Sequence, residues 1–210
     1  MTLRKADALY QNGDQAGAKK LLVKWLDAHE EKTLPIVLYH GIIPQANDPA
    51  LALPTNVSVA TLESQLRALK EAGYVSITAQ QAVDWFKGVA DLPKKPILIT
   101  FDDARLDSLE NADPLLEQYG FNAVMFAPIH NVAGNLPGFA NWKELAAYQA
   151  NGRWEVQAHG DKGHTYVQMD QAGRKGLFLP NRMWNEAEKR METQAEWEDR
   201  VRADHLGSKE

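Results

Sequence analysis

Apolar side chains occur along this chain in two patterns, short continuous runs and helical spacings. The runs LPIVLYH (34–40), PILITF (96–101) and NAVMFAP (122–128) have the length of strands. Continuous apolar runs are typical of strands covered on both faces, as in parallel sheets. Residues 58–73 instead space their leucines along one helical face, behind a serine suited to the N-cap and before a closing glycine, which predicts a helix. By the same criteria we expect helices at 79–88, 108–120 and 141–152 and short strands at 74–78 and 154–159.

Strands that alternate with helices of this length indicate βαβ units, and therefore an α/β fold built on a parallel sheet or barrel. In such folds, ligands bind at the carboxyl ends of the strands. Three predicted strands end on titratable residues, namely His40, the pair Asp102 and Asp103, and His159. We expect these strand ends to lie close together.

The first part of the chain has a different pattern. Residues 3–30 carry apolar or small side chains at helical spacing, and QNGD at 11–14 interrupts them. This predicts an αα-hairpin over residues 1–32, which resembles a tetratricopeptide-like unit and is a candidate contact surface for a protein partner. The alternative is a simple docking or capping appendage. Residues 33–210 form the predicted α/β domain.

Composition narrows the classes of partner and metal site. Apolar residues make up 44% and charged residues 24% of the 210 residues, as in soluble globular proteins. The net charge of −5, with both signs interspersed, argues against nucleic-acid partners and a polybasic membrane surface. Cysteine is absent, so any metal must be held by histidines and carboxylates. We find neither an apolar stretch of membrane-spanning length nor the apolar core of a secretion signal.

Asp102 and Asp103 are adjacent acids at the end of a buried strand. Neighbouring side chains of a strand point to opposite faces, so both acids face one point only where the strand has given way to a loop. There, one carboxylate can bind a metal ion while the other approaches a water molecule, and a cation offsets the cost of burying them. The alternative is that one aspartate caps the following helix or a turn.

The segment VQAHGDKGHTY places His159 and His164 five residues apart. Neither a helix nor a strand aims two side chains at that spacing toward one ion, but a loop does, and Gly160 and Gly163 give the backbone the freedom to form it. Two imidazoles and a carboxylate form a metal site with positions open to water and substrate. The alternative is that both histidines are solvent-exposed loop residues.

These segments together resemble a known family. LPIVLYHGI, the helix and strand that follow at 58–78, PILITFDDARLDSLENADPLLEQYGFNAVMF and HGDKGH are similar in order and spacing to the polysaccharide deacetylases of the NodB-homology group, carbohydrate esterase family 4, over residues 34 to about 165. The histidine spacing and the tail from residue 179 resemble the poly-β-1,6-N-acetylglucosamine N-deacetylase branch of biofilm exopolysaccharide systems.

The resemblance implies a deformed (β/α) barrel in which Asp103, His159 and His164 bind a divalent metal ion, usually zinc, and Asp102 is the general base. It implies a metal-dependent hydrolase that removes N-acetyl groups from an N-acetylglucosamine polysaccharide, in the periplasm or outside the cell. His40 matches the family's first-strand histidine, which either lines the substrate pocket or supports the site from behind the ligands.

The chain departs from the family pattern at several points. Ala104 and Gly160 stand where the family usually has glycine and a serine or threonine. The later segments of the type R-x-P-Y and L-x-H, which supply oxyanion stabilisation and a general acid in the family, are not found. We therefore expect residues 33–210 to be a partial domain, a barrel incomplete at its C-terminal side, that binds metal better than it turns over substrate.

Arg182 and Trp184 are candidates for contact with sugar, because aromatic faces stack on pyranose rings. The alternative is that the charged segment 184–210 is one solvated helical face. Two other functions stay open. The same site could act on peptidoglycan, chitin fragments or a non-sugar amide, or the domain could be a carbohydrate-binding or interaction module without turnover.

Overall fold

The computed structural model describes residues 5, 8–9, 12–28, 33–45 and 48–208. The chain divides into two compact units, Met1–Pro35 and Ile36–Glu210. In the first unit, α2 (Gln15–Ala28) is an α-helix. The helix predicted ahead of it falls largely outside the described residues, so the αα-hairpin stays a prediction.

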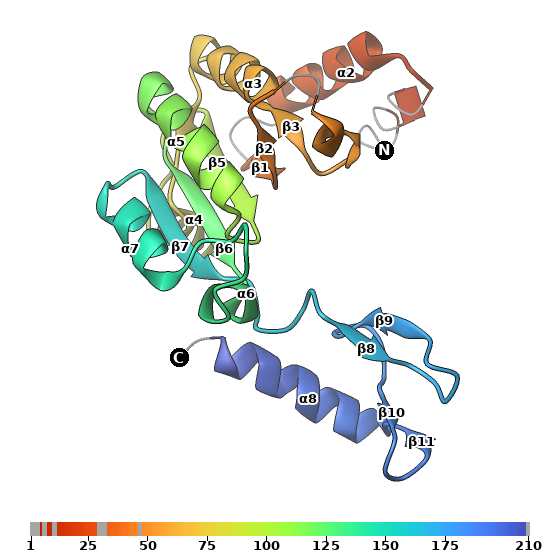
Figure 1. Cartoon of the computed structure of the whole chain (residues 1–210). Helices are drawn as coiled ribbons and strands as arrows, with labels where there is room; N and C mark the ends of the chain where they lie inside the picture. The colour runs from red at the N-terminus through yellow and green to blue at the C-terminus, as the bar shows by residue number, and fades with distance from the viewer. Residues whose placement is uncertain (1–4, 6–7, 10–11, 29–32, 46–47, 209–210) are drawn as a thin grey trace. The chain divides into compact units, whose positions relative to one another are not determined.

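The second unit contains the sheet and the remaining helices (Figure 1). In chain order they are β1 (Ile36–Tyr39), β2 (Ile42–Ile43), the 3-10 helix η1 (Pro49–Ala52), β3 (Val57–Ser58), α3 (Val59–Glu71), β4 (Val75–Ser76), α4 (Ala79–Phe86), β5 (Pro96–Asp102), α5 (Leu106–Tyr119), β6 (Ala123–Ala127), α6 (Ile129–Ala133), α7 (Trp142–Ala150), β7 (Trp154–Ala158), β8 (Tyr166–Gln168), β9 (Lys175–Leu177), β10 (Trp184–Asn185), β11 (Arg190–Met191) and α8 (Gln194–Gly207). Of the helices described, none has the length and apolar character needed to cross a bilayer.

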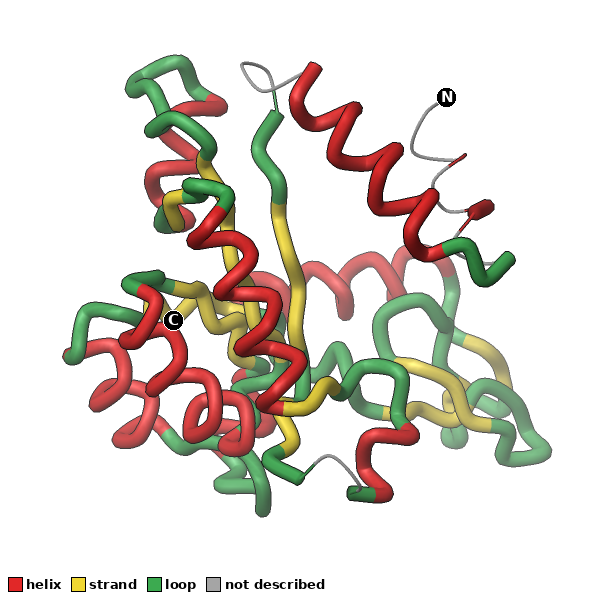
Figure 2. The backbone as a smooth tube through the Cα atoms, turned by 90° about the horizontal axis from the view of Figure 1, so that it is seen from above, coloured by secondary structure: helices red, strands yellow, loops and turns green. Residues whose placement is uncertain are grey.

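A parallel sheet forms the centre of this unit. Its strands lie in the order β1-β5-β6-β7, and β4 also pairs with β5. All these pairings are parallel. The tube in Figure 2 shows the same alternation, since yellow strands lead through green loops into red helices. The α/β fold with a parallel sheet, predicted from the continuous apolar runs, is confirmed. In the described part of the chain the sheet stays open and does not close into a barrel.

The helices between the strands begin where their sequences place capping residues. The side chain of Ser58 accepts a hydrogen bond from the backbone N–H of Thr61 and begins α3. Asn141 forms a capping box with Glu144 at the start of α7. Such caps satisfy N–H groups that have no partner within the helix, so each helix begins at a defined residue.

The core is centred on β5, whose residues Pro96 to Phe101 are all buried. The ring of Phe101 lies 5.2 Å from that of Tyr39 and 5.1 Å from that of Trp154, so one aromatic side chain joins β5 to β1 and β7. Burying a side chain of this size contributes roughly 1.5–3 kcal/mol. β1 differs from the prediction. It pairs with β5 alone, and its Leu38 side chain is 54% exposed, so this strand is not covered on both faces.

The C-terminal segment also differs from the prediction. The charged helix expected over 184–210 begins only at Gln194, and the antiparallel strands β10 and β11 precede it. Asn185 explains the difference, because its side-chain oxygen accepts hydrogen bonds from the backbone N–H groups of Ala187 and Glu188 and thereby forms a turn. Lys189 completes the turn in a left-handed conformation, with φ at 52°.

A polar cluster fixes α5 to the start of β7. The carboxylate of Asp113 accepts hydrogen bonds from Arg153 Nε at 2.9 Å, Trp154 Nε1 at 2.8 Å and Asn151 Nδ2 at 3.0 Å. Burial by itself would raise the pKa of Asp113, but the hydrogen bonds from Arg153, Trp154 and Asn151 outweigh it and hold this pKa below its ordinary value. The folded state therefore favours the ionised carboxylate.

We expect Asp113→Asn to lower the free energy of unfolding at pH 7 by about 1.5–3 kcal/mol, the range for hydrogen bonds to a charged group. Because the folded pKa is depressed, this contribution is fully present above the unfolded pKa of about 3.9 and is lost as the pH falls through that value toward the folded pKa. Urea unfolding at pH 7, 5 and 3 should show the gap between the wild type and Asp113→Asn narrowing at pH 3. Asp91→Asn, at an exposed loop position, is the control. A gap that does not depend on pH would contradict the prediction.

Candidate metal and catalytic site

The chain leaves the direction of β5 immediately after Asp102. Asp103 and Ala104 both have left-handed backbone conformations, with φ at 75° and 55°. This conformation costs a non-glycine residue about 1–2 kcal/mol, and such strain is found at functional sites. The backbone N–H of Ala140 donates a 2.8 Å hydrogen bond to the carbonyl of Ala104 and holds the turn. Both carboxylates consequently reach the same side chain, since His159 Nε2 lies 3.5 Å from Asp102 Oδ2 and 4.0 Å from Asp103 Oδ1.

The parallel pairing of β6 and β7 positions His159. Its backbone N–H donates a 3.0 Å hydrogen bond to the carbonyl of Ala127 and extends the pairing one residue beyond β7. The loop from Gly160 to His164 then folds back, with Gly160 left-handed at φ 73°. The rings of His159 and His164 come to 5.0 Å between centroids.

The structure brings Asp103, His159 and His164 together. One oxygen or nitrogen of each side chain lies within 4.8 Å of the corresponding atoms of the other two. His164 Nε2 lies 3.1 Å from Asp103 Oδ1. Asp103 Oδ1 is buried and nevertheless accepts no hydrogen bond. A buried carboxylate oxygen facing imidazole nitrogens is the arrangement that a divalent cation satisfies, and this donor set suits zinc and similar ions.

Asp102 and His40 lie beside these three residues. Asp102 Oδ2 is 4.0 Å from His40 Nε2, and the side chain of Asp102 is 13% exposed. Burial raises the pKa of the Asp102 carboxyl, and the opposing electrostatic effects of His159 and His40 do not cancel the rise. The hydroxyl of the buried Ser108 donates to the backbone carbonyl of His40, which fixes the end of β1 against α5.

Arg182 and Trp184 lie elsewhere in the C-terminal segment. Arg182 lines a cavity of about 430 Å³ together with Arg174, Trp197 and other residues of that segment. Trp184 Nε1 donates a 2.6 Å hydrogen bond to Glu186. This cavity is not lined by the strand-end residues His40, Asp102, Asp103 and His159. A role for Arg182 and Trp184 in substrate binding stays a prediction.

One residue at the site was not predicted from the sequence. Asp204, on α8, is buried and accepts hydrogen bonds from the backbone N–H groups of Asp161 and Lys162, in the loop between the two histidines. The helix that carries it has polar residues on all sides, so hydrophobic periodicity gives no sign of a buried face. Carboxylates that bind only backbone groups leave no spacing pattern in the sequence.

Comparison with known proteins agrees with this fold and identifies the family. The model of the polysaccharide deacetylase family matches residues 90–210, which is more than half of the chain. The chain therefore belongs to the polysaccharide deacetylase family, as its motifs led us to expect.

Relatives and solved structures make the likeness more specific. Poly-beta-1,6-N-acetyl-D-glucosamine N-deacetylase of Escherichia coli K12 is 24% identical over 182 residues, which cover 80% of this chain and 26% of the relative. A de-N-acetylase structure from Aggregatibacter actinomycetemcomitans superposes with a TM-score of 0.72 at 22% identity, covering 83% of this chain and 72% of that one. The BpsB deacetylase domain from Bordetella bronchiseptica gives a TM-score of 0.66 at 23% identity, with the same coverage. At these identities the structures show a shared fold.

The chain is shorter than the curated relatives it matches, since it spans 26% of the length of the Escherichia coli protein and 38% of that of a Staphylococcus aureus relative of the same name. The activity and substrate of those longer proteins are therefore not assigned to this chain by similarity alone.

The geometry predicts that the chain binds one divalent ion through Asp103, His159 and His164. Isothermal titration of the metal-stripped protein with zinc or cobalt should show one site. His164→Ala should weaken binding by more than the tenfold to hundredfold typical for loss of an outer partner of a ligand. His205→Ala, an exposed histidine on α8, is the matched control and should bind as the wild type does. Equal affinities for both variants would rule out this set of ligands.

Proposed function

We propose that this chain carries the metal-dependent catalytic site of an N-deacetylase that acts on an N-acetylglucosamine polysaccharide, most specifically a β-1,6-linked polymer. One observation carries the proposal, the convergence of a carboxylate and two imidazoles at strand ends, with a second carboxylate 3.5 Å from one imidazole. Membership of the polysaccharide deacetylase family supports the reaction class. The name of the Escherichia coli relative supports the choice of polymer.

In this proposal, Asp103, His159 and His164 hold the cation, for which zinc is the best match to the donor set. When bound, the cation supplies Lewis acidity, which polarises the acetamide carbonyl and makes water more acidic. The strained turn at Asp103 places its carboxylate toward the histidines rather than along β5. The protein would thus supply three ligands, one carboxylate and two imidazoles.

Asp102 is the proposed general base. Its Oδ2 atom takes a proton from the attacking water as the oxygen–carbon bond forms. The carbon–nitrogen bond then breaks as this proton passes to the departing nitrogen, so one water is consumed, acetate and an amine are released, and Asp102 is ionised again. His40, 4.0 Å from Asp102, is proposed to orient this carboxylate.

The exposure of the site supports a polymeric substrate. The side chains of His164 and His159 are 50% and 32% exposed, so the site opens to solvent at the surface rather than at the end of a closed tunnel. A sugar within a long chain can approach a site of this kind without threading. N-acetylglucosamine is neutral, which agrees with a chain that has no excess of basic residues.

We expect Asp102→Asn to lower acetate release from N-acetylglucosamine oligomers by about 10²- to 10⁴-fold, the usual contribution of a positioned general base. Metal content should stay at the wild-type level, because the three proposed ligands are intact. Acetate is measured enzymatically and metal by mass spectrometry on the same preparations. Asp91→Asn serves as the exposed control.

Two outcomes would overturn the proposal. Wild-type protein that binds the oligomers stoichiometrically but releases no acetate would instead be a carbohydrate-binding module. Undiminished release by Asp102→Asn would show that another group takes the proton.

A further inference from the structure

The loop that joins His159 to His164 is held by hydrogen bonds on two sides. On one side, the first backbone N–H groups of α6 donate to it, from Ile129 to the carbonyl of Gly160 at 3.0 Å and from His130 to that of Asp161 at 3.3 Å. On the other side, a side chain from α8 accepts from the loop. The short loop is therefore fixed through its own backbone between two helices.

The acceptor on α8 is Asp204, which is 6% exposed and is the one charged residue among the four buried polar residues of the described chain. Its Oδ1 accepts from the N–H of Lys162 at 2.7 Å, and its Oδ2 accepts from that of Asp161 at 3.2 Å. Each oxygen thus takes one of two consecutive N–H groups. Hydrogen bonds to an ionised acceptor are roughly twice as strong as neutral ones, and loss of one buried partner is costly.

Gly160 is matched to this carboxylate. Its backbone is left-handed, with φ at 73°, and a Cβ atom at this position would lie 3.1 Å from Asp204 Oδ2. Any larger residue here would be strained by its backbone conformation and crowded against the carboxylate. This explains in physical terms why a glycine, rather than a serine or threonine, follows His159.

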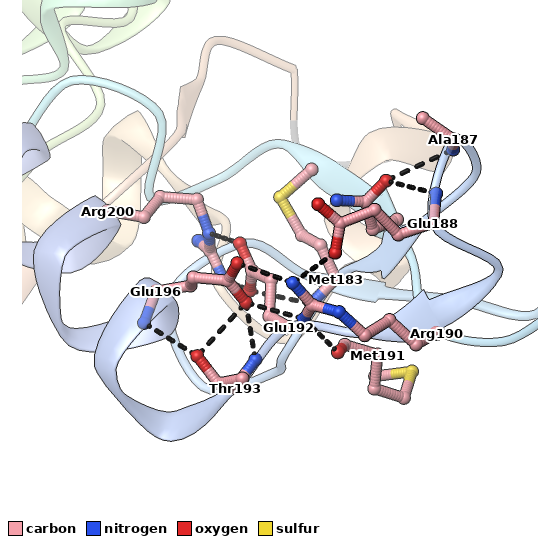
Figure 3. A network of polar contacts seen from close by, with 10 residues as sticks. Met183, Ala187, Glu188, Arg190, Met191, Glu192, Thr193, Glu196 and Arg200 are labelled. Carbon is pink, nitrogen blue, oxygen red and sulfur yellow. Dashed lines mark hydrogen bonds and ion pairs between the residues drawn. The ribbon is translucent and has the colours of Figure 1, made fainter.

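Polar contacts fix α8 itself to the segment before it. Arg200 donates to the carbonyls of Phe178 and Asn181, both at 2.8 Å, and to both oxygens of Glu192, and its guanidinium lies 4.3 Å from the ring centre of Phe178. Figure 3 shows Arg200 and Glu192 beside the capped first turn of the helix. Asp204 follows Arg200 by four residues, on the same face of α8. The anchored helix therefore carries Asp204 to the loop, and in Figure 1 its C-terminal end lies near α6.

We propose that Asp204 is a positioning residue for the metal centre. By holding the amides of Asp161 and Lys162, it sets where the imidazole of His164 lies relative to that of His159. It contacts neither the substrate nor the cation. This inference rests on the proposed function of Asp103, His159 and His164 as ligands.

The test compares Asp204→Asn with Asp199→Asn, which changes an exposed aspartate on the same helix. An asparagine has nearly the same shape but offers one acceptor oxygen and turns an NH₂ group toward the second backbone N–H. We expect the dissociation constant for cobalt to rise about tenfold or more in Asp204→Asn, with a changed visible absorption spectrum of the bound cobalt, whereas Asp199→Asn should match the wild type. In the metal-free proteins, the amides of residues 161 and 162 should exchange with deuterium faster in Asp204→Asn alone.

The outcomes separate the two proposals. Wild-type protein that binds no cobalt would overturn the proposed function, and this inference with it. Wild-type affinity, spectrum and amide exchange in Asp204→Asn would overturn the inference alone. Should Asp204→Asn fail to fold, deuterium exchange of the metal-free wild type is the test. Exchange of the amides of residues 161 and 162 at the rate of an unstructured peptide would exclude their hydrogen bonds to Asp204.

Discussion

The site depends on one backbone constraint, the abrupt end of β5 at Asp102. If the strand continued by a single residue, the carboxylates of Asp102 and Asp103 would point to opposite faces of the sheet. Two successive left-handed residues prevent this, and the segment at Ala140 holds them in place. The strain is sustained because β5 is buried from Pro96 to Phe101, so the packing of the core fixes the position at which the turn begins.

The parallel sheet supplies the second half of the geometry. Because β1, β5, β6 and β7 run in one direction, their carboxyl ends meet at one edge. His40 and His159 follow β1 and β7 there, and β6 lies between β5 and β7 as the spacer that sets their separation. The approach of His40 and His159 to Asp102 is thus a consequence of the topology, whereas the turn at Asp103 and the loop to His164 are local adaptations.

The elements and site residues differ in how well the sequence predicts them. Buried strands such as β5 were predictable, and so were helices with side-chain caps such as α7, which begins after Asn141. Apolar runs and capping residues act locally and are therefore visible in the sequence. The strand-end residues followed from the fold class. The hairpin at Asn185 and the burial of Asp204 were not predictable, because both are stabilised by hydrogen bonds between polar side chains and the backbone, which leave no periodic pattern.

The polar contacts of Arg200 and Asp204 that hold α8 in place also limit the local stability of the site. The sheet resists opening because apolar surface is buried on both faces of β5, whereas α8 is retained mainly by directional polar contacts. Segments with few apolar contacts open by local unfolding at free energies below that of global unfolding. Fraying of this helix withdraws support from the loop of His164 while the parallel sheet remains native. The arrangement of Asp103, His159 and His164 therefore lasts only as long as α8 stays folded.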